Sequence, residues 1–233
     1  MDASHVAMLR ELLAGSGWID RTREFARSLR RSARPGGLLL VGTPSEEPWH
    51  LAAHLSDESR LAGRPELEPT LVRWDPPAGA PAHLAVGLSR LEAAARGETL
   101  FVVAPDQAPA SLLERISDAR GVGATILALD AGDPELEGLA HDTLTVPGIG
   151  PTVRTGSGLH VPASYAETAR RPAEAVEDVP AEALVSMATV QHLVSTAAGE
   201  PDRPGRRGLR ERLSRFLDAV SGPSPDGGGP PHW

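Results

Sequence analysis

Residues 98–130 decide the fold, and they read ETLFVVAPDQAPASLLERISDARGVGATILALD. Two short apolar runs, 99–104 and 124–129, flank a segment that carries leucine and isoleucine at helical spacing. Apolar runs of this length, bounded by turn residues, are typical of strands buried on both faces of a parallel sheet. The stretch therefore predicts a strand, a helix and a second strand parallel to the first.

The same alternation continues in both directions along the chain. Further apolar runs occupy residues 38–41, 70–74 and 142–146, and helical spacing recurs at 82–96 and 109–120. Five strands separated by helical segments predict an α/β fold, a doubly wound five-stranded parallel sheet of flavodoxin-like size with helices on both faces. A ligand site is then expected outside the carboxyl ends of the strands.

Helical segments are predicted on both sides of the sheet. Residues 1–33 are expected to form a helical lead, and the α/β domain is expected to span 34–198. Its last helix is predicted around 181–198. Residues 199–220 then form a linker and a short arginine-rich amphipathic helix, and the Gly- and Pro-rich residues 221–233 are expected to be disordered.

The composition excludes several kinds of chemistry. The chain has 23 basic residues, all arginine, against 31 acidic ones, for a net charge of −8, and it contains no cysteine. Without lysine or cysteine there is no Schiff base, no P-loop lysine, no thiol nucleophile and no disulfide. No run of about 18 apolar residues and no signal-peptide pattern occurs, so we expect a cytoplasmic protein without a transmembrane segment.

Four sequence blocks, together with the strand at 98–104, carry a resemblance to a known family. They are Arg34-Pro-Gly-Gly-Leu-Leu-Leu-Val-Gly42, His50-Leu-Ala-Ala-His-Leu55, Gly123-Ala-Thr-Ile-Leu-Ala-Leu129 and Leu139-Ala-His-Asp-Thr-Leu-Thr-Val-Pro147. In this order they resemble the sugar isomerase (SIS) domain family, and most of all its phosphoheptose isomerase branch. The resemblance covers roughly residues 5–198. It implies a phosphosugar-related ligand and a homodimer or higher oligomer, since such domains generally complete their sites across subunits.

The family holds its sugar phosphate in two turns, and both differ in this chain. The resemblance implies an anion cradle made of backbone N–H groups and hydroxyls after the first strand and after a later strand. Here the two turns read GTPSEEP at 42–48 and APDQAPAS at 104–111. Prolines remove donors, and the carboxylates of Glu46, Glu47 and Asp106 repel an anion.

Four residues of these turns remain candidates for ligand binding: Gly42, Thr43, Ser45 and Ser111. The alternative interpretation is that the turns only start helices, with Thr43, Ser45 or Asp106 as helix caps.

Three histidines are the candidate catalytic and metal-binding residues. The resemblance implies a helix histidine, a glutamate one turn later, and a glutamine and a histidine on the last helix, which hold a metal and move protons. His50 matches the helix histidine, His54 stands at the glutamate position, Leu184 at the glutamine position, and His192 near the last-helix histidine. The spacing of His50 and His54 suits zinc binding, but an ordinary histidine pair looks identical. We expect no cofactor, with zinc as the alternative.

Two further segments have a functional and a plain interpretation. Arg154, Thr155 and Ser157 could form a substitute anion cradle, or the loop could be an ordinary hairpin turn. The arginine-rich helix within 199–220 could dock on an acidic protein partner, a membrane surface or nucleic acid, or it could simply pack on the domain.

Together these features predict an SIS-like domain that binds a carbohydrate derivative, such as a sugar phosphate or a similar small anion, without isomerising it. Catalysis is left open but disfavoured, because the glutamate that would transfer the proton is replaced by His54. The alternatives are an active phosphosugar isomerase with a rearranged site, and a non-catalytic scaffold or regulatory module.

Overall fold

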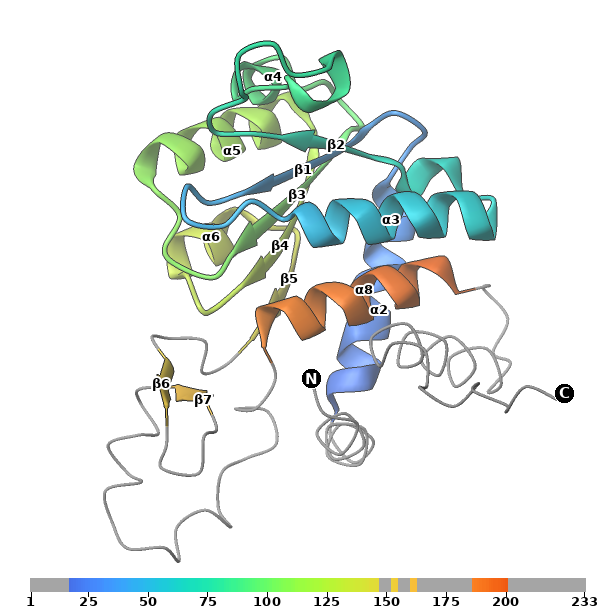
Figure 1. Cartoon of the computed structure of the whole chain (residues 1–233), viewed down its shortest axis with the longest axis vertical. Helices are drawn as coiled ribbons and strands as arrows, with labels where there is room; N and C mark the ends of the chain where they lie inside the picture. Colours follow the sequence, from blue (N-terminus) through green and yellow to red (C-terminus); the bar gives the residue numbers. More distant parts are fainter. Residues whose placement is uncertain (1–16, 147–151, 155–159, 163–185, 201–233) are drawn as a thin grey trace, which may run out of the picture.

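A computed structural model describes residues 17–146, 152–154, 160–162 and 186–200. Its centre is a five-stranded sheet in the order β2-β1-β3-β4-β5, with every pair of neighbours parallel (Figure 1). The strands are β1 (Leu38–Gly42), β2 (Pro69–Val72), β3 (Thr99–Ala104), β4 (Thr125–Asp130) and β5 (Asp142–Thr145). The predicted doubly wound parallel sheet is confirmed, in the strand order of flavodoxin-like folds.

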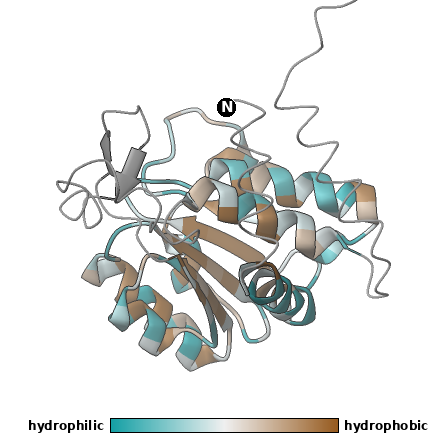
Figure 2. Ribbon diagram, turned by 90° about the horizontal axis from the view of Figure 1, so that it is seen from below, coloured by the Kyte–Doolittle hydropathy of each residue, from teal (hydrophilic) through white to brown (hydrophobic). Residues whose placement is uncertain are grey.

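Helices cover both faces of the sheet (Figures 1 and 2). One face carries α2 (Trp18–Ser32), α3 (Trp49–Ala62) and α8 (Met187–Gly199), and the other carries α4 (Ser89–Glu92), α5 (Ala110–Val122) and α6 (Pro134–Leu139). Figure 2 shows the apolar strands enclosed between more polar helices, which is the three-layer arrangement that the buried apolar runs require.

Strands β1 to β4 send alternate side chains into two separate cores. In β3, Phe101 and Val103 belong to the cluster under α2, α3 and α8, whereas Leu100 and Val102 belong to the cluster under α5. The ring of Phe101 packs against that of Phe25 on α2, with centroids 5.4 Å apart. Because both faces of β1, β3 and β4 are buried, these strands are continuous apolar runs and show no polar alternation.

The segment between β2 and β3 corrects one prediction. A helix was expected over 82–96, but the structure has only the 3-10 turn η2 (Ala82–Leu84) and the single-turn α4. The backbone around Gly87 is instead pinned to the end of β2, where the N–H of Arg73 donates to the carbonyl of Val86 at 2.8 Å. This tie interrupts the helical spacing that the leucines suggested.

The other short elements are a 3-10 turn and a two-stranded hairpin. A 3-10 turn, η1 (Pro65–Leu67), precedes β2, and β6 (Thr152–Arg154) pairs antiparallel with β7 (His160–Pro162). The hairpin interpretation of the loop that includes Arg154 is therefore confirmed for its paired backbone. None of the described helices is long and apolar enough to cross a membrane.

Arginine side chains tie α8 to its neighbours. Arg30 of α2 donates to the carbonyl oxygens of Ala197 and Ala198, and Arg64 donates to that of Glu200 at 3.3 Å. These carbonyls lie at the C-terminal end of the helix, which carries the negative end of its dipole. The guanidinium groups therefore fix the position of α8 as well as satisfying its end.

The turn after β1 folds directly back over the strand end. A Cβ added at Gly42 would lie 2.0 Å from the carbonyl oxygen of Glu46 and 2.7 Å from the Cδ of Pro48. No side chain fits there, so this glycine is required by the close approach of two backbone segments.

Replacing Gly42 by alanine is expected to lower the free energy of unfolding by about 2–3 kcal/mol, because the turn must move away from β1. The matched control is Gly138→Ala on α6, where an added Cβ meets nothing within 4 Å. That change should leave stability unchanged or raise it by up to about 1 kcal/mol. Urea denaturation of both variants measures the difference, and equal midpoints would contradict the close approach.

Candidate functional site

The turn after β1 uses its own hydroxyls internally. Thr43 Oγ1 and Ser45 Oγ are 2.9 Å apart, and Ser45 Oγ donates to Asp106 Oδ2 at 2.7 Å. Thr43 is only 1% exposed. The structure thus brings Gly42, Thr43 and Ser45 together at the end of β1, where both hydroxyls are engaged in hydrogen bonds, and their role in ligand binding stays a prediction.

The helix-cap interpretation of these turns is wrong. The residue that precedes α3 is Pro48 and the residue that precedes α5 is Pro109, and neither start has a side-chain cap. Asp106 instead accepts the hydroxyl of Ser45 and links the loop after β3 to the turn after β1. Ser111 lies exposed in the first turn of α5.

Glu47 is the centre of a polar cluster at the carboxyl ends of β1 and β2. Its Oε2 accepts hydrogen bonds from Arg73 Nε and Trp49 Nε1, both at 3.0 Å, and its Oε1 accepts from the backbone N–H of Trp74 at 3.1 Å. The side chains of Glu47 and Arg73 are each only 15% exposed. Arg73 therefore neutralises Glu47, which corrects the expectation that this carboxylate repels an anion.

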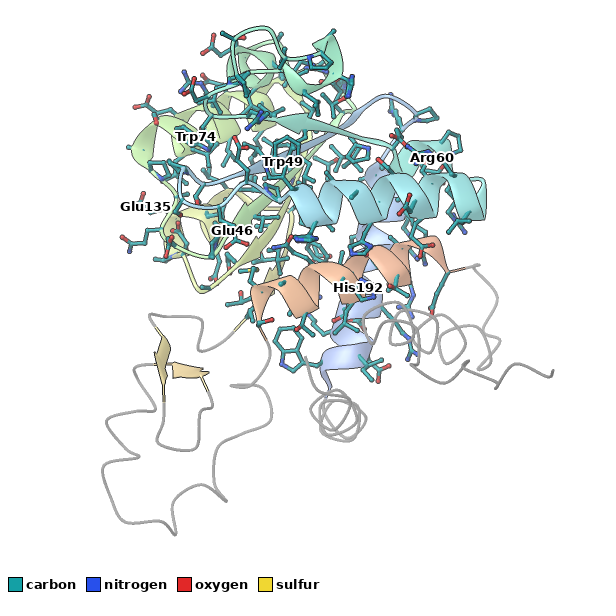
Figure 3. The ribbon with its side chains drawn as sticks, viewed as in Figure 1. Glu46, Trp49, Arg60, Trp74, Glu135 and His192 are labelled. Carbon is teal, nitrogen blue, oxygen red and sulfur yellow. The ribbon has the colours of Figure 1, made fainter. Side chains whose placement is uncertain are left out.

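Figure 3 shows Trp49, Trp74 and Glu46 near the start of α3. The indole N–H of Trp74 donates to the carbonyl of Gly42 at 2.8 Å, so both tryptophans donate to the turn after β1. Glu46 is also engaged, since Gln191 Nε2 of α8 approaches its Oε1 at 3.4 Å. The turn is thus held from β2, from α3 and from α8.

Replacing Glu47 by alanine is expected to cost about 2–3 kcal/mol of unfolding free energy, because Arg73 is left partly buried without its counter-charge. The control is Asp57→Ala, which removes the partner of Arg60 in a pair whose side chains are 64% and 70% exposed. That exposed pair should contribute at most about 0.5 kcal/mol. Chemical denaturation near pH 7 compares the two, and equally small losses would mean that the Glu47 cluster is screened by water.

An open cavity of about 340 Å³ lies one strand further along the sheet. It is formed by the loops that follow β3 and β4, and its lining residues are Pro105, Asp106, Gln107, Ala131, Gly132 and Asp133. This is the carboxyl edge of a parallel sheet, where ligands of α/β folds bind. None of these six lining residues is basic, so the cavity offers no cation to a phosphate group.

Asp133 joins the two loops that form the cavity. Its Oδ1 caps α6 by accepting from the backbone N–H groups of Glu135 and Leu136, and its Oδ2 accepts from the N–H of Ala108 at 2.8 Å. The cavity wall is therefore held in place by hydrogen bonds that cross from one loop to the other. Our sequence analysis missed this residue, although Asp133 followed by a proline is a typical helix start.

Asp130 is a buried acid beside the cavity loop. It ends β4 and is fully buried, its Oδ1 accepts from the N–H of Gly132 at 3.1 Å, and its Oδ2 has no hydrogen-bond partner within the described part of the chain. Burial is the main cause that raises the pKa of Asp130 to about 6; Gly132 and Thr145 oppose this rise, and the nearby Glu137 and Asp133 add to it. Unpaired buried carboxyl groups of this kind are concentrated at functional sites.

The structure brings two of the three candidate histidines together. His54 Nε2 lies 3.4 Å from His192 Nδ1, with the rings edge to face between α3 and α8. His50 is exposed at the start of α3. The described residues contain no group of three His, Cys, Asp or Glu side chains placed to hold a metal. Two nitrogen donors alone do not make a structural or catalytic zinc site, so the fit to the metal implied by the resemblance is incomplete.

Both histidines favour the neutral form. Burial, with a smaller contribution from the neighbouring His54, lowers the pKa of His192 to about 4. Burial also lowers the pKa of His54, with a further contribution from His50 and an opposing one from Asp57. His192 Nε2 additionally lies 3.4 Å from Thr196 Oγ1. At neutral pH the pair is an uncharged polar contact between two helices.

The depressed pKa of His192 has a definite effect on stability. The unfolded chain binds a proton below about pH 6.5, the ordinary pKa, whereas the folded chain resists it until about pH 4. The stability that neutral His192 contributes is therefore lost as the pH falls through this window. Wild type should lose about 1–2 kcal/mol relative to His192→Gln between pH 7 and pH 4.

Urea denaturation at several pH values measures this difference. Asp130, whose pKa is raised, acts in the opposite direction, but it is present in both proteins and cancels in the comparison. A gap between the two proteins that does not change with pH would show that His192 titrates normally in the folded chain.

The remaining predicted site residues are not placed by the structure. Arg154 lies on β6, of which only the backbone is described, and Thr155 and Ser157 lie outside the described residues, as does Leu184. The arginine-rich segment after residue 200 is outside them too. The proposals for these segments stay predictions.

Comparison with known proteins supports the fold. No protein-family model matches the chain, and no curated protein matches its sequence. Among solved structures, it is similar to a "Putative sugar binding protein" from Salmonella typhimurium LT2, with a TM-score of 0.50 and 15% identity over 92% of this chain and 52% of that one. A "putative phosphosugar isomerase" from Silicibacter pomeroyi DSS-3 gives a TM-score of 0.47 and 16% identity over 91% of this chain and 51% of that one.

The chain thus spans about half the length of each of these two structures. At such low identity the likeness to the Salmonella protein concerns the fold, which is the α/β architecture predicted from the sequence.

Proposed function

We propose that this chain is an SIS-like domain that binds a carbohydrate derivative at the carboxyl edge of its sheet and does not isomerise it. Two kinds of support combine here. The fold is shared with a structure described as a sugar-binding protein, and the sequence blocks resemble the SIS family, most of all its phosphoheptose isomerase branch. Fold alone does not define function, so the proposal depends on the site.

The cavity between the loops after β3 and β4 is the observation that carries the proposal. Its volume of about 340 Å³ falls within the range of small-molecule sites. The exposed carboxylate of Asp106 and the exposed amide of Gln107 are hydrogen-bond acceptors that suit the hydroxyl donors of a sugar. Asp133 keeps both loops fixed, so little ordering is needed when a ligand binds.

The same lining favours hydroxyl groups over a phosphate. A phosphate is normally bound by arginine, by lysine or by free backbone N–H groups, and the residues that line the cavity include no basic side chain. The prolines at positions 44 and 105 remove further donors. We therefore place neutral carbohydrate derivatives ahead of sugar phosphates, which the sequence analysis had put first.

We propose that the chain does not isomerise its ligand because of the arrangement of His54 and His192. His54 replaces the glutamate that the family resemblance would require as a proton-transfer group, and its ring faces His192 between two helices. Neither histidine lines the described cavity. The contact between them is nevertheless the observation that favours the second candidate, an isomerase with a rearranged site, because a neutral His192 can accept a proton.

Homo-oligomerisation, an acidic partner for the arginine-rich segment within 199–220 and a cytoplasmic location belong to the proposal as well. They follow from the resemblance and from the sequence. The absence of a cofactor is a further proposal, which elemental analysis of the purified protein tests.

Thermal-shift and calorimetric titrations test the binding. We expect N-acetylglucosamine or methyl β-glucopyranoside to stabilise the chain more than fructose 6-phosphate does. A ligand at about 100 times its Kd should add about 2.7 kcal/mol to the free energy of unfolding. Asp106→Ala should weaken binding about tenfold or more by removing the acceptor.

The matched control is Asp118→Ala, which removes an exposed carboxylate from α5 outside the cavity lining. If Asp106→Ala and Asp118→Ala bind the sugar with equal affinity, the cavity is not the binding site. Turnover of fructose 6-phosphate or sedoheptulose 7-phosphate that disappears in His192→Ala would replace the proposal with the isomerase alternative. If no sugar or sugar phosphate binds, the scaffold alternative is favoured.

A further inference from the structure

Trp49 is a large apolar side chain left partly in water. Its residue is 40% exposed at the start of α3, although the other apolar residues that begin this helix, Leu51 and Leu55, are fully buried. Leaving an indole exposed forgoes hydrophobic stabilisation, since burial contributes roughly 25 cal/mol per Å² of apolar area. The exposed part of the indole is therefore available for contact with a molecule outside the fold.

The exposed ring is nevertheless held in one orientation. Its Nε1 donates to Glu47 at 3.0 Å, and the guanidinium carbon of Arg73 lies 4.5 Å from the ring centroid. Arg73 is itself bonded to Glu47, which also accepts the backbone N–H of Trp74. The indole is thus fixed at its N–H and over one face, and it would lose little conformational freedom on contact with a ligand.

The surroundings of Trp49 suit a small molecule better than a protein partner. Within the described residues, the other exposed large apolar side chains are Leu61 and Val122. Leu61 lies about 18 Å further along α3, at about 1.5 Å per residue, and Val122 ends α5 on the opposite face of the sheet. Large contiguous apolar patches mark protein interfaces, and among the described residues Trp49 is not part of such a patch.

The charges around Trp49 also favour a small carbohydrate ligand. Glu47 and Arg73 form an ion pair, so neither of the two charged groups that contact Trp49 presents an unpaired charge to a ligand. An aromatic face carries a partial negative charge and attracts polarised C–H groups. The apolar face of a closed sugar ring is a flat array of such C–H groups, whereas an open-chain polyol has no such face.

We propose that Trp49 is the stacking surface for a closed pyranose ring, and that it determines specificity for the carbohydrate ligand. This inference rests on the proposed function, because it assigns the ligand class of the same carboxyl edge. Ser45 and Glu47 belong to one turn: Ser45 donates to Asp106, which lines the cavity, and Glu47 accepts from Trp49, so the turn links the indole to the cavity wall. Trp49 acts by contact with the ligand, and Glu47 and Arg73 act as positioning residues.

Saturation-transfer NMR and calorimetry on the full chain test this proposal, with methyl β-glucopyranoside as the ring probe and sorbitol as the open-chain probe. Trp49→Ala should weaken binding of the glucopyranoside about tenfold or more. Trp49→Tyr keeps an aromatic face and should stay within about threefold of wild type. Saturation transfer to the ring C–H protons should fall in the alanine variant. The control is Leu61→Ala, which removes an 80% exposed side chain from the same helix and should change nothing.

The outcomes separate this inference from the proposed function. If the glucopyranoside binds wild type and Trp49→Ala equally well, the stacking role is wrong while carbohydrate binding stands. If alanine and tyrosine variants lose affinity equally, the aromatic face is not what the ligand contacts, and the inference is overturned. If wild type binds sorbitol as tightly as the glucopyranoside, ring selectivity is refuted. If no probe binds wild type, the proposed function fails together with the inference.

Discussion

The close approach of the turn 43–48 to the end of β1 is the constraint on which the functional edge of this protein depends. In a doubly wound sheet, the crevice beside the first strand is the usual ligand position, because the chain leaves that strand and its neighbour in opposite directions. Here the carbonyl of Glu46 occupies the space that a Cβ at Gly42 would need. The turn is then tied to β2 through Arg73, to the loop after β3 through Asp106 and to α8 through Gln191. The open cavity is consequently displaced by one strand, to the loops after β3 and β4.

Arginine side chains hold several helix ends and the Glu47 carboxylate in place. Guanidinium groups hold the last carbonyls of α8 through Arg30 and Arg64, and those of α6 through Arg120. A planar fork with five donors can bridge two carbonyl oxygens or a carboxylate and an aromatic ring at once, as Arg73 does with Glu47 and Trp49. A lysine would supply a single point charge at each of these places. Because all basic residues are arginine, single side chains such as Arg30, Arg73 and Arg120 each contact two partners at once.

Much of the fold could be predicted from the sequence, whereas the site could be predicted only in part. The run at 99–104 matches β3 in full, because a strand buried on both faces needs an uninterrupted apolar sequence. The helix expected over 82–96 failed because a tertiary hydrogen bond from Arg73 overrides local spacing. The contact between His54 and His192 joins residues 138 positions apart, which no local pattern encodes. Asp133 carried a readable signal, a capping residue before a proline, but its second role in joining two loops depends on the sheet order.

The way α8 is attached determines which part of the molecule can unfold locally. Within the described residues this helix joins no strand, and it is held by apolar packing on α2 and α3, by the side-chain contacts of Gln191 and His192, and by arginine contacts at one end. The sheet, in contrast, is held by continuous backbone ladders. Elements that lack such ladders can open as units without global unfolding. A probe in α8 and a probe in β3 would then report two different free energies, and the histidine pair would separate in a native-like molecule whose sheet is still intact.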